Sequence, residues 1–340
     1  MQALRNGSAT HHLIAPPSTP TLPSRRSGSV GDVARFSDVL DVRPTDSDCF
    51  MAPAAGVHGR PSLFGGRVAA QALRAAALTV VGGDRPPRPH SFHCYFVRPG
   101  RIDEPLELRV TRVRDGRSFS TRKVGAFQGA DEILSAMVSF QREEEGGEFS
   151  TAPVLPPGDP EALEPVQMGD WESEAELRLL PGQALGDGAP FPEVLRYWAK
   201  LPGPHVSGDP VAEACGVTFI SDMRAGGAAL AAERATFGPA TSLGTDPGHE
   251  SPAGEAPAPE REDAGPGRRS GMIASLDHAI WFHRRGDPTN WLLFTVRPLA
   301  NTSSRGLVLG MVHGPDGSHV ASFTQELVVR SSRGPAAAAT

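Results

Sequence analysis

The chain has 340 residues, of which 39% are hydrophobic, and a net charge of −6. This length fits two domains with a core large enough to be stable, and the mixing of acidic and basic residues leaves no basic stripe for nucleic acid. No apolar run approaches the length of a membrane span, so we expect a soluble protein without a transmembrane segment.

The three cysteines are widely spaced and form no CxxC pair; they are Cys49, Cys94 and Cys215. An odd count without close pairs argues against a disulfide framework and against a zinc site. The pattern therefore predicts reduced thiols in a reducing compartment, and we expect a cytoplasmic protein.

Four segments differ in composition from the rest of the chain. Residues 1–31 contain Arg, Ser and Pro but no acidic residue, which predicts a disordered tail, with a transit peptide as the alternative. Residues 147–190 predict an interdomain linker with one or two short strands. Residues 236–270 lack the large apolar side chains that offset ordering entropy and predict a flexible insertion, and residues 333–340 predict a second tail. The two ordered units between these segments are 32–146 and 191–332.

The first ordered unit begins with a helix and continues as strands. Residues 65–81 follow a Gly-Gly pair and consist mainly of small apolar residues, which predicts a helix that neighbouring elements approach on nearly all sides. Alternation of Leu106, Leu108 and Val110 with polar residues predicts a half-buried strand. A hairpin turn with positive φ is expected at Asp115–Gly116. Further strands are expected at 91–98, 118–127 and 133–141, so the pattern is α+β, with one sheet curled around the helix.

The second ordered unit repeats this plan. Asp209 and Pro210 form a helix start, an N-cap acid followed by Pro at the first helical position, and the helix is expected to run to about Asp222. Strands are expected at 272–283, 291–298, 306–313 and 320–330. Two copies of a helix followed by a meander of strands suggest a tandem duplication.

Three polar residues of the second unit occupy apolar positions. Asp222 continues the helix face of Val211, Cys215 and Thr218. Gln325 interrupts a row of apolar residues on one face of the last strand, and Ser275 has apolar neighbours on both sides. Each has a structural interpretation: a helix-end acid, a buried hydrogen-bonding amide and a packing residue. A carboxylate, a hydroxyl and an amide from three elements can also converge on a water molecule and form a hydrolytic site.

Six motifs, taken together and in this order, resemble the acyl-CoA thioesterase II family of tandem double-hotdog enzymes. They are FGGRVAAQAL (64–73), HSFHCYFVRPG (90–100), RDGRSFSTRKV (114–124), ASLDHAIWFHR (274–284), SSRGLVLG (303–310) and VASFTQE (320–326). The resemblance implies two tandem hotdog folds, each a central helix wrapped by an antiparallel β-sheet.

The resemblance also implies a catalytic trio. The Asp of the family falls on Asp222, its Thr or Ser on Ser275, and its Gln on Gln325. The implied reaction is hydrolysis of an acyl-CoA thioester to a fatty acid and CoA without a covalent intermediate. Asp222 is expected to act as the general base, while Ser275 and Gln325 hold the water by hydrogen bonds.

Three further residues are candidates for the oxyanion or substrate site. Backbone N–H groups at a helix N-terminus favour a developing negative charge, which makes Gly65 and Gly66 candidates, although glycines there also serve close packing. His90 matches a His near the site of the family, with a core histidine as the alternative. Arg67 and Arg224 depart from the usual residues of the family.

Two other enzyme classes fit the sequence less well. A serine hydrolase needs a G-x-S-x-G elbow, which the sequence lacks. A hotdog dehydratase needs a His five residues after the Asp, where this chain has Gly227. The remaining alternative is a non-catalytic hotdog protein that binds acyl-CoA. We expect no cofactor and no metal, acyl-CoA as the substrate, and a homo-oligomer, either a dimer or a tetramer.

Overall fold

The structure is a computed structural model. It describes residues 36–55, 62–80, 87–150, 158–166, 175–183, 193–202, 208–237 and 272–330. The predicted tails 1–31 and 333–340 lie outside the described residues, as do all but the first two residues of the predicted insertion 236–270.

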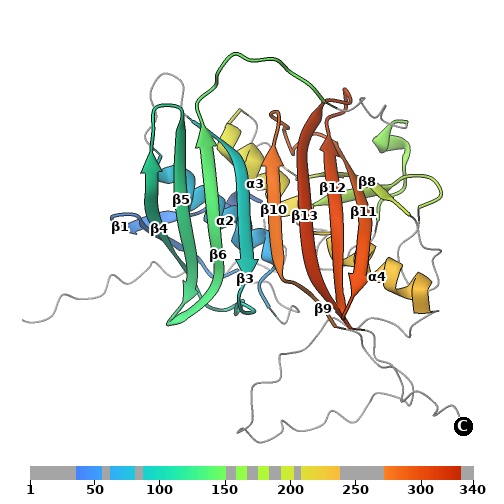
Figure 1. The fold of residues 1–340 in the computed structure, drawn as a ribbon, viewed down its shortest axis with the longest axis horizontal. Helices are drawn as coiled ribbons and strands as arrows, with labels where there is room; N and C mark the ends of the chain where they lie inside the picture. The colour runs from blue at the N-terminus through green and yellow to red at the C-terminus, as the bar shows by residue number, and fades with distance from the viewer. Residues whose placement is uncertain are drawn as a thin grey trace, which may run out of the picture. The chain divides into compact units, whose positions relative to one another are not determined.

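The elements follow one another along the chain as shown in Figure 1. Those of the first half are α1 (Phe36–Val39), β1 (Arg43–Asp46), β2 (Cys49–Ala52), α2 (Gly65–Leu78), β3 (Arg88–Phe96), β4 (Leu106–Asp115), β5 (Phe119–Gln128) and β6 (Asp131–Gln141). Those of the second half are η1 (Pro160–Ala162), β7 (Glu176–Leu179), β8 (Leu195–Lys200), α3 (Pro210–Ser221), α4 (Ala225–Phe237), β9 (Met272–Ser275), β10 (Asp277–Phe282), β11 (Leu292–Thr302), β12 (Arg305–His313) and β13 (His319–Arg330).

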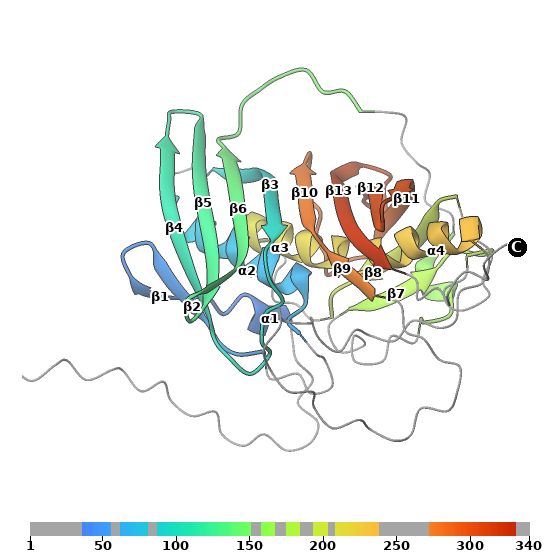
Figure 2. The same ribbon diagram turned by 60° about the horizontal axis from the view of Figure 1, so that its bottom comes forward.

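The helix α2 confirms the first predicted helix, although it ends at Leu78 rather than at residue 81. Its buried alanines lie at positions 69, 70, 72, 75 and 76. These small side chains let α3 and the strands β3 to β6 pack close to its backbone on several sides (Figure 2). The side chain of Asp209 accepts hydrogen bonds from two backbone N–H groups at the start of α3, as the predicted N-cap requires.

All strands of the described residues belong to one antiparallel sheet, in the order β1-β2-β4-β5-β6-β3-β10-β13-β12-β11-β8-β7, with β9 paired to β13. The order β2-β4-β5-β6-β3 of the first half recurs as β8-β11-β12-β13-β10 in the second. The pairing of β3 with β10 joins the two halves, and α2, α3 and α4 lie on one face of the sheet (Figures 1 and 2).

The strand predicted at 272–283 is interrupted by a β-bulge. Ser275 pairs with Leu327, whereas Ala279 pairs with Thr324. The segment from 275 to 279 therefore contains one residue more than the segment of β13 that it faces. The carboxylate of Asp277 accepts the backbone N–H of Glu326 at 2.7 Å and so takes the place of a ladder partner. Because side chains alternate along a strand, the extra residue shifts the alternation by one and turns residues on either side of it toward the same face.

Two expectations about local structure were wrong or incomplete. Asp115 and Gly116 do not have positive φ, because three residues, 116 to 118, connect β4 and β5. Connections longer than two residues form without the primed turns that need positive φ. The sequence analysis also did not predict β1, β2, β8 or α4. The predicted linker contains a strand as expected, β7, and this strand pairs with β8.

Candidate active site

Asp222, Ser275 and Gln325 come together on the helix-covered side of the sheet. Asp222 is the C-cap residue of α3, Ser275 ends β9, and Gln325 lies in β13. The Gln325 side-chain amide donates to Asp222 Oδ1 and, at 2.7 Å, to Ser275 Oγ. The Ser275 hydroxyl donates to Asp222 Oδ1 at 3.2 Å. The three residues that interrupted apolar patterns in the sequence therefore form one hydrogen-bonded cluster.

The other carboxylate oxygen of Asp222 bonds to the first half of the chain. The backbone N–H of Gly66, in the first turn of α2, donates to Asp222 Oδ2 at 2.7 Å. The C-terminus of α3 is an unfavourable place for a negative charge, whereas the N-terminus of α2 is a favourable one. The first turn of α2 therefore compensates for the position of Asp222 at the end of α3.

Gly65 lies against the same carboxylate. A Cβ atom built on Gly65 would be 2.8 Å from Asp222 Oδ2, closer than van der Waals contact allows. One built on Gly66 would be 2.6 Å from the backbone oxygen of Phe219 in α3. Close packing against the α3 backbone thus requires a glycine at position 66, whereas a side chain at position 65 would displace the Asp222 carboxylate. The Gly65 N–H has no hydrogen-bond partner in the part of the chain that the structure describes.

Both amide hydrogens of Gln325 are used within the cluster. Its side chain is completely buried, and both amide hydrogens face protein acceptors, Asp222 Oδ1 and Ser275 Oγ. In this arrangement Gln325 has no hydrogen left for a water molecule, which differs from the role expected of it. Asp222 is 7% exposed and Ser275 is half-buried, so a water can approach the cluster beside these two side chains.

His278 is a fourth member of the cluster, completely buried, which the sequence analysis did not select. Its Nδ1 lies 3.2 Å from Gln325 Oε1, and its Nε2 lies 2.9 Å from the Ser221 hydroxyl. Burial lowers the pKa of His278, although the nearby Asp222 carboxylate acts in the opposite direction. Simple alternation places His278 and Ser275 on opposite faces of a strand, and the bulge between them removes that difference.

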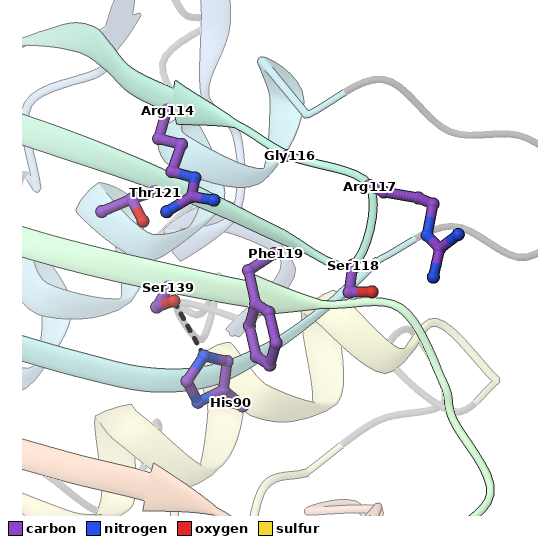
Figure 3. A pocket seen from close by; sticks show the side chains of 8 residues that line it. All are labelled: His90, Arg114, Gly116, Arg117, Ser118, Phe119, Thr121 and Ser139. Atoms are coloured by element: carbon purple, nitrogen blue, oxygen red, sulfur yellow. Dashed lines mark hydrogen bonds between the residues drawn. The ribbon is translucent and has the colours of Figure 1, made fainter.

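His90 does not lie beside the other candidates. It sits in β3 with its Nε2 2.8 Å from Ser139 Oγ, next to a cavity of about 450 Å³ (Figure 3). The cavity is lined by His90, Arg114, Gly116, Arg117, Ser118, Phe119, Thr121 and Ser139. Thr121 and Ser139 alternate with buried residues, so they lie on the face of the sheet that points away from α2. The structure thus groups Gly65 and Gly66, but not His90, with the trio.

The two arginines that depart from the usual residues of the family, Arg67 and Arg224, are buried or nearly so. Arg67 lies in α2 and is 5% exposed. Arg224 lies between α3 and α4, and burial lowers the pKa of its guanidinium, whereas the neighbouring Tyr197 hydroxyl raises it.

Among the described residues, no group of three His, Cys, Asp or Glu side chains is placed to hold a metal ion. None of the described helices combines the length and apolar character of a membrane span.

Known proteins resemble this chain over most of its length. Residues 54–141 match the family described as Acyl-CoA thioesterase N-terminal domain, and residues 150–329 match Acyl-CoA thioesterase C-terminal domain. Acyl-coenzyme A thioesterase 8 of Rattus norvegicus is 28% identical over 317 residues, which cover 87% of this chain and 88% of the relative.

Solved structures also resemble this chain over most of its length. An acyl-CoA thioesterase II from Mycobacterium marinum is 29% identical, with a TM-score of 0.65, over 87% of this chain and 98% of that one. A protein from Alicyclobacillus acidocaldarius described as having a hot dog fold has 18% identity and a TM-score of 0.65, over 88% of this chain and 98% of that one. The fold is therefore a hotdog fold. With both family domains matched in order, the chain belongs to the acyl-CoA thioesterase II family.

Proposed function

We propose that the protein hydrolyses acyl-CoA thioesters to a carboxylic acid and CoA with a water molecule that Asp222 activates, and without a covalent intermediate. The observation that carries this proposal is the hydrogen-bonded cluster of Asp222, Ser275 and Gln325, to which the backbone N–H of Gly66 also donates. Membership in the acyl-CoA thioesterase II family supplies the substrate class.

The proposed role of Asp222 is general base catalysis. Its carboxylate accepts hydrogen bonds from three groups, which hold it in one orientation. A water at its solvent-facing side gives up a proton to the carboxylate while its oxygen bonds to the thioester carbon. The carbon–sulfur bond then breaks, and the proton passes from Asp222 to the CoA thiolate, so the carboxylate is regenerated.

Ser275 and Gln325 have different proposed roles. Ser275 is half-buried, and its hydroxyl oxygen can accept a hydrogen bond from the attacking water. Gln325 uses both amide hydrogens on Asp222 and Ser275, so it orients these two side chains rather than the water itself. Fixing the base and the hydroxyl in advance lowers the entropic part of the barrier.

The proposed oxyanion donor is the Gly65 N–H. The thioester oxygen gains negative charge as water adds, and unpaired N–H groups at a helix N-terminus stabilise such a charge. Gly66 donates to Asp222, which leaves Gly65 as the donor of this first turn that has no described partner. In this proposal the first turn of α2 both holds the base and receives the oxyanion.

We also propose that the chain consists of two hotdog folds in tandem, with the domain boundaries given above. The support is the strand order that recurs in the two halves and the position of α2 and α3–α4 against them. The active site then combines the helix N-terminus of one repeat with the Asp, Ser and Gln of the other. The cytoplasmic location and the homo-oligomer stay predictions.

The test is release of the CoA thiol from a panel of acyl-CoA substrates that differ in chain length. We expect turnover with at least one chain length, and acyl-CoA binding without thiol release would favour the non-catalytic alternative. A single turnover in ¹⁸O-labelled water, with enzyme in excess, tests the mechanism. We expect one labelled oxygen in the acid product and none in the protein. An unlabelled acid with label in Asp222 would show an acyl-enzyme and overturn direct attack by water.

A further inference from the structure

His278 and Ser221 continue the hydrogen bonds of the active-site cluster into the protein interior. Ser221 ends α3, next to Asp222, and His278 lies in β10 one residue after the bulge at Asp277. Both side chains are completely buried, as is Gln325. His278 lies between the other two, with Nε2 at 2.9 Å from Ser221 Oγ and Nδ1 at 3.2 Å from Gln325 Oε1.

The Asp222 carboxylate determines how the Gln325 amide is turned. Asp222 Oδ1 can only accept hydrogen bonds, so the amide nitrogen of Gln325 faces it. The opposite orientation would set the amide oxygen against the carboxylate oxygen. With the nitrogen toward Asp222 and Ser275, the amide oxygen of Gln325 faces His278 and must accept a hydrogen bond from Nδ1.

This requirement determines the tautomer of His278. Burial lowers the pKa of His278, which favours the neutral ring with a single N–H. With that proton on Nδ1, the Nε2 atom accepts a hydrogen bond from the Ser221 hydroxyl. The Ser221 hydroxyl also lies within donor distance of the backbone oxygen of Thr218, at 2.9 Å. Because Nε2 without a proton can only accept, the single Ser221 proton then points to His278.

We propose that His278 is a positioning residue whose Nδ1–H donates to Gln325 Oε1 and so locks the Gln325 amide with both hydrogens toward Asp222 and Ser275. The donors then run in one direction, from Ser221 to His278 to Gln325 to Asp222. This inference rests on the proposed roles of Asp222, Ser275 and Gln325. It adds a residue that touches neither the substrate nor the water and acts only through Gln325.

The test compares two substitutions of similar size. In His278→Asn the side-chain nitrogen occupies the position of Nδ1 and still donates to Gln325 Oε1. In His278→Gln the nitrogen occupies the position of Nε2, and the donor to Gln325 is lost. We expect His278→Gln to lower kcat by about 10- to 100-fold with KM nearly unchanged, and His278→Asn to keep about a third or more of kcat.

Two measurements separate positioning from a structural role. In a Gln325→Ala background, His278→Gln is expected to cause no further loss of kcat, because its effect passes through Gln325. Equal losses in the Asn and Gln variants, or additive losses with Gln325→Ala, would overturn the inference. Thiol release by the wild-type protein in the same assay keeps the outcomes apart, since its absence contradicts the proposed function and not the tautomer of His278.

The tautomer itself gives a readout that does not depend on activity or on the stability of the His278 variants. In ¹⁵N-histidine-labelled wild-type protein at pH 7, Nδ1 of His278 is expected to show the resonance of a protonated nitrogen and Nε2 that of an unprotonated one. Ser221→Ala removes the donor to Nε2 and is expected to lower kcat by about two- to tenfold with KM unchanged. A proton on Nε2 in the wild-type ring would overturn the inference.

Discussion

Gly65→Ala is expected to displace the Asp222 carboxylate. The added Cβ would lie 2.8 Å from Asp222 Oδ2 and 3.0 Å from the Phe96 ring. Ordinary contact between carbon and oxygen begins near 3.4 Å, so the carboxylate oxygen must retreat by about 0.6 Å. That retreat lengthens the hydrogen bond from Gly66 N, which is 2.7 Å long.

The lost interaction sets the expected size of the effect. A hydrogen bond to a charged group contributes about 1.5–3 kcal/mol. Because 1.36 kcal/mol corresponds to a factor of ten in rate, kcat should fall by about 10- to 100-fold if the bond holds the base in the transition state. The assay is thiol release at saturating acyl-CoA, with the thermal midpoint as a check that the variant is folded.

Gly227→Ala is the matched control. Gly227 lies in α4, and a Cβ there would meet no atom within 4 Å, so the change adds the same methyl group without a clash. Alanine favours a helix over glycine, and we expect unchanged kcat and an equal or higher thermal midpoint. A folded Gly65→Ala protein with wild-type kcat would refute the idea that Asp222 works from its position against α2.

Three further predictions concern stability. Arg122 is fully buried and donates to the backbone oxygen and hydroxyl of Thr79 at the end of α2. In urea unfolding, Arg122→Met should therefore lower the free energy of unfolding by about 2–4 kcal/mol. The control Arg112→Met removes an exposed arginine paired with Asp48 and should lower it by at most about 1 kcal/mol. Ser304 has a φ of 60° in the two-residue turn between β11 and β12, and Ser304→Gly should raise the free energy of unfolding by about 0.5 kcal/mol. Burial lowers the pKa of three clustered histidines, His283, His313 and His319. The unfolded chain therefore takes up protons before the folded protein does, and the thermal midpoint should fall as the pH drops below about 6.5. Replacing these histidines with Gln should reduce that fall.

Much of the fold could be predicted because its signals are local. The alternation at Leu106, Leu108 and Val110 marks a strand with one buried face, and these residues are buried in β4. Asp209 and Pro210 mark the start of α3 by capping chemistry alone. The strand β8 is short, and α4 begins with Ala-Gly-Gly, which disfavours a helix in isolation, so tertiary packing decides these two elements.

The cluster could be predicted only in part. Asp222, Ser275 and Gln325 each interrupted an apolar pattern, so the sequence marked them individually. The bond between Gly66 and Asp222 joins residues 156 positions apart and depends on how α2 meets α3. His278 could not be predicted as a member of the cluster, because a β-bulge that the sequence does not reveal turns it toward Gln325.

Asp222→Asn tests the central claim most directly. The substitution keeps the shape of the side chain but removes its basicity, and the new amide group would face a hydrogen-bond donor on at least one side. With the protein folded, acyl-CoA bound and substrate saturating, we predict that kcat for thiol release falls by about 100-fold or more. Wild-type kcat under those conditions would contradict the account, because the water would then be activated by a group other than Asp222.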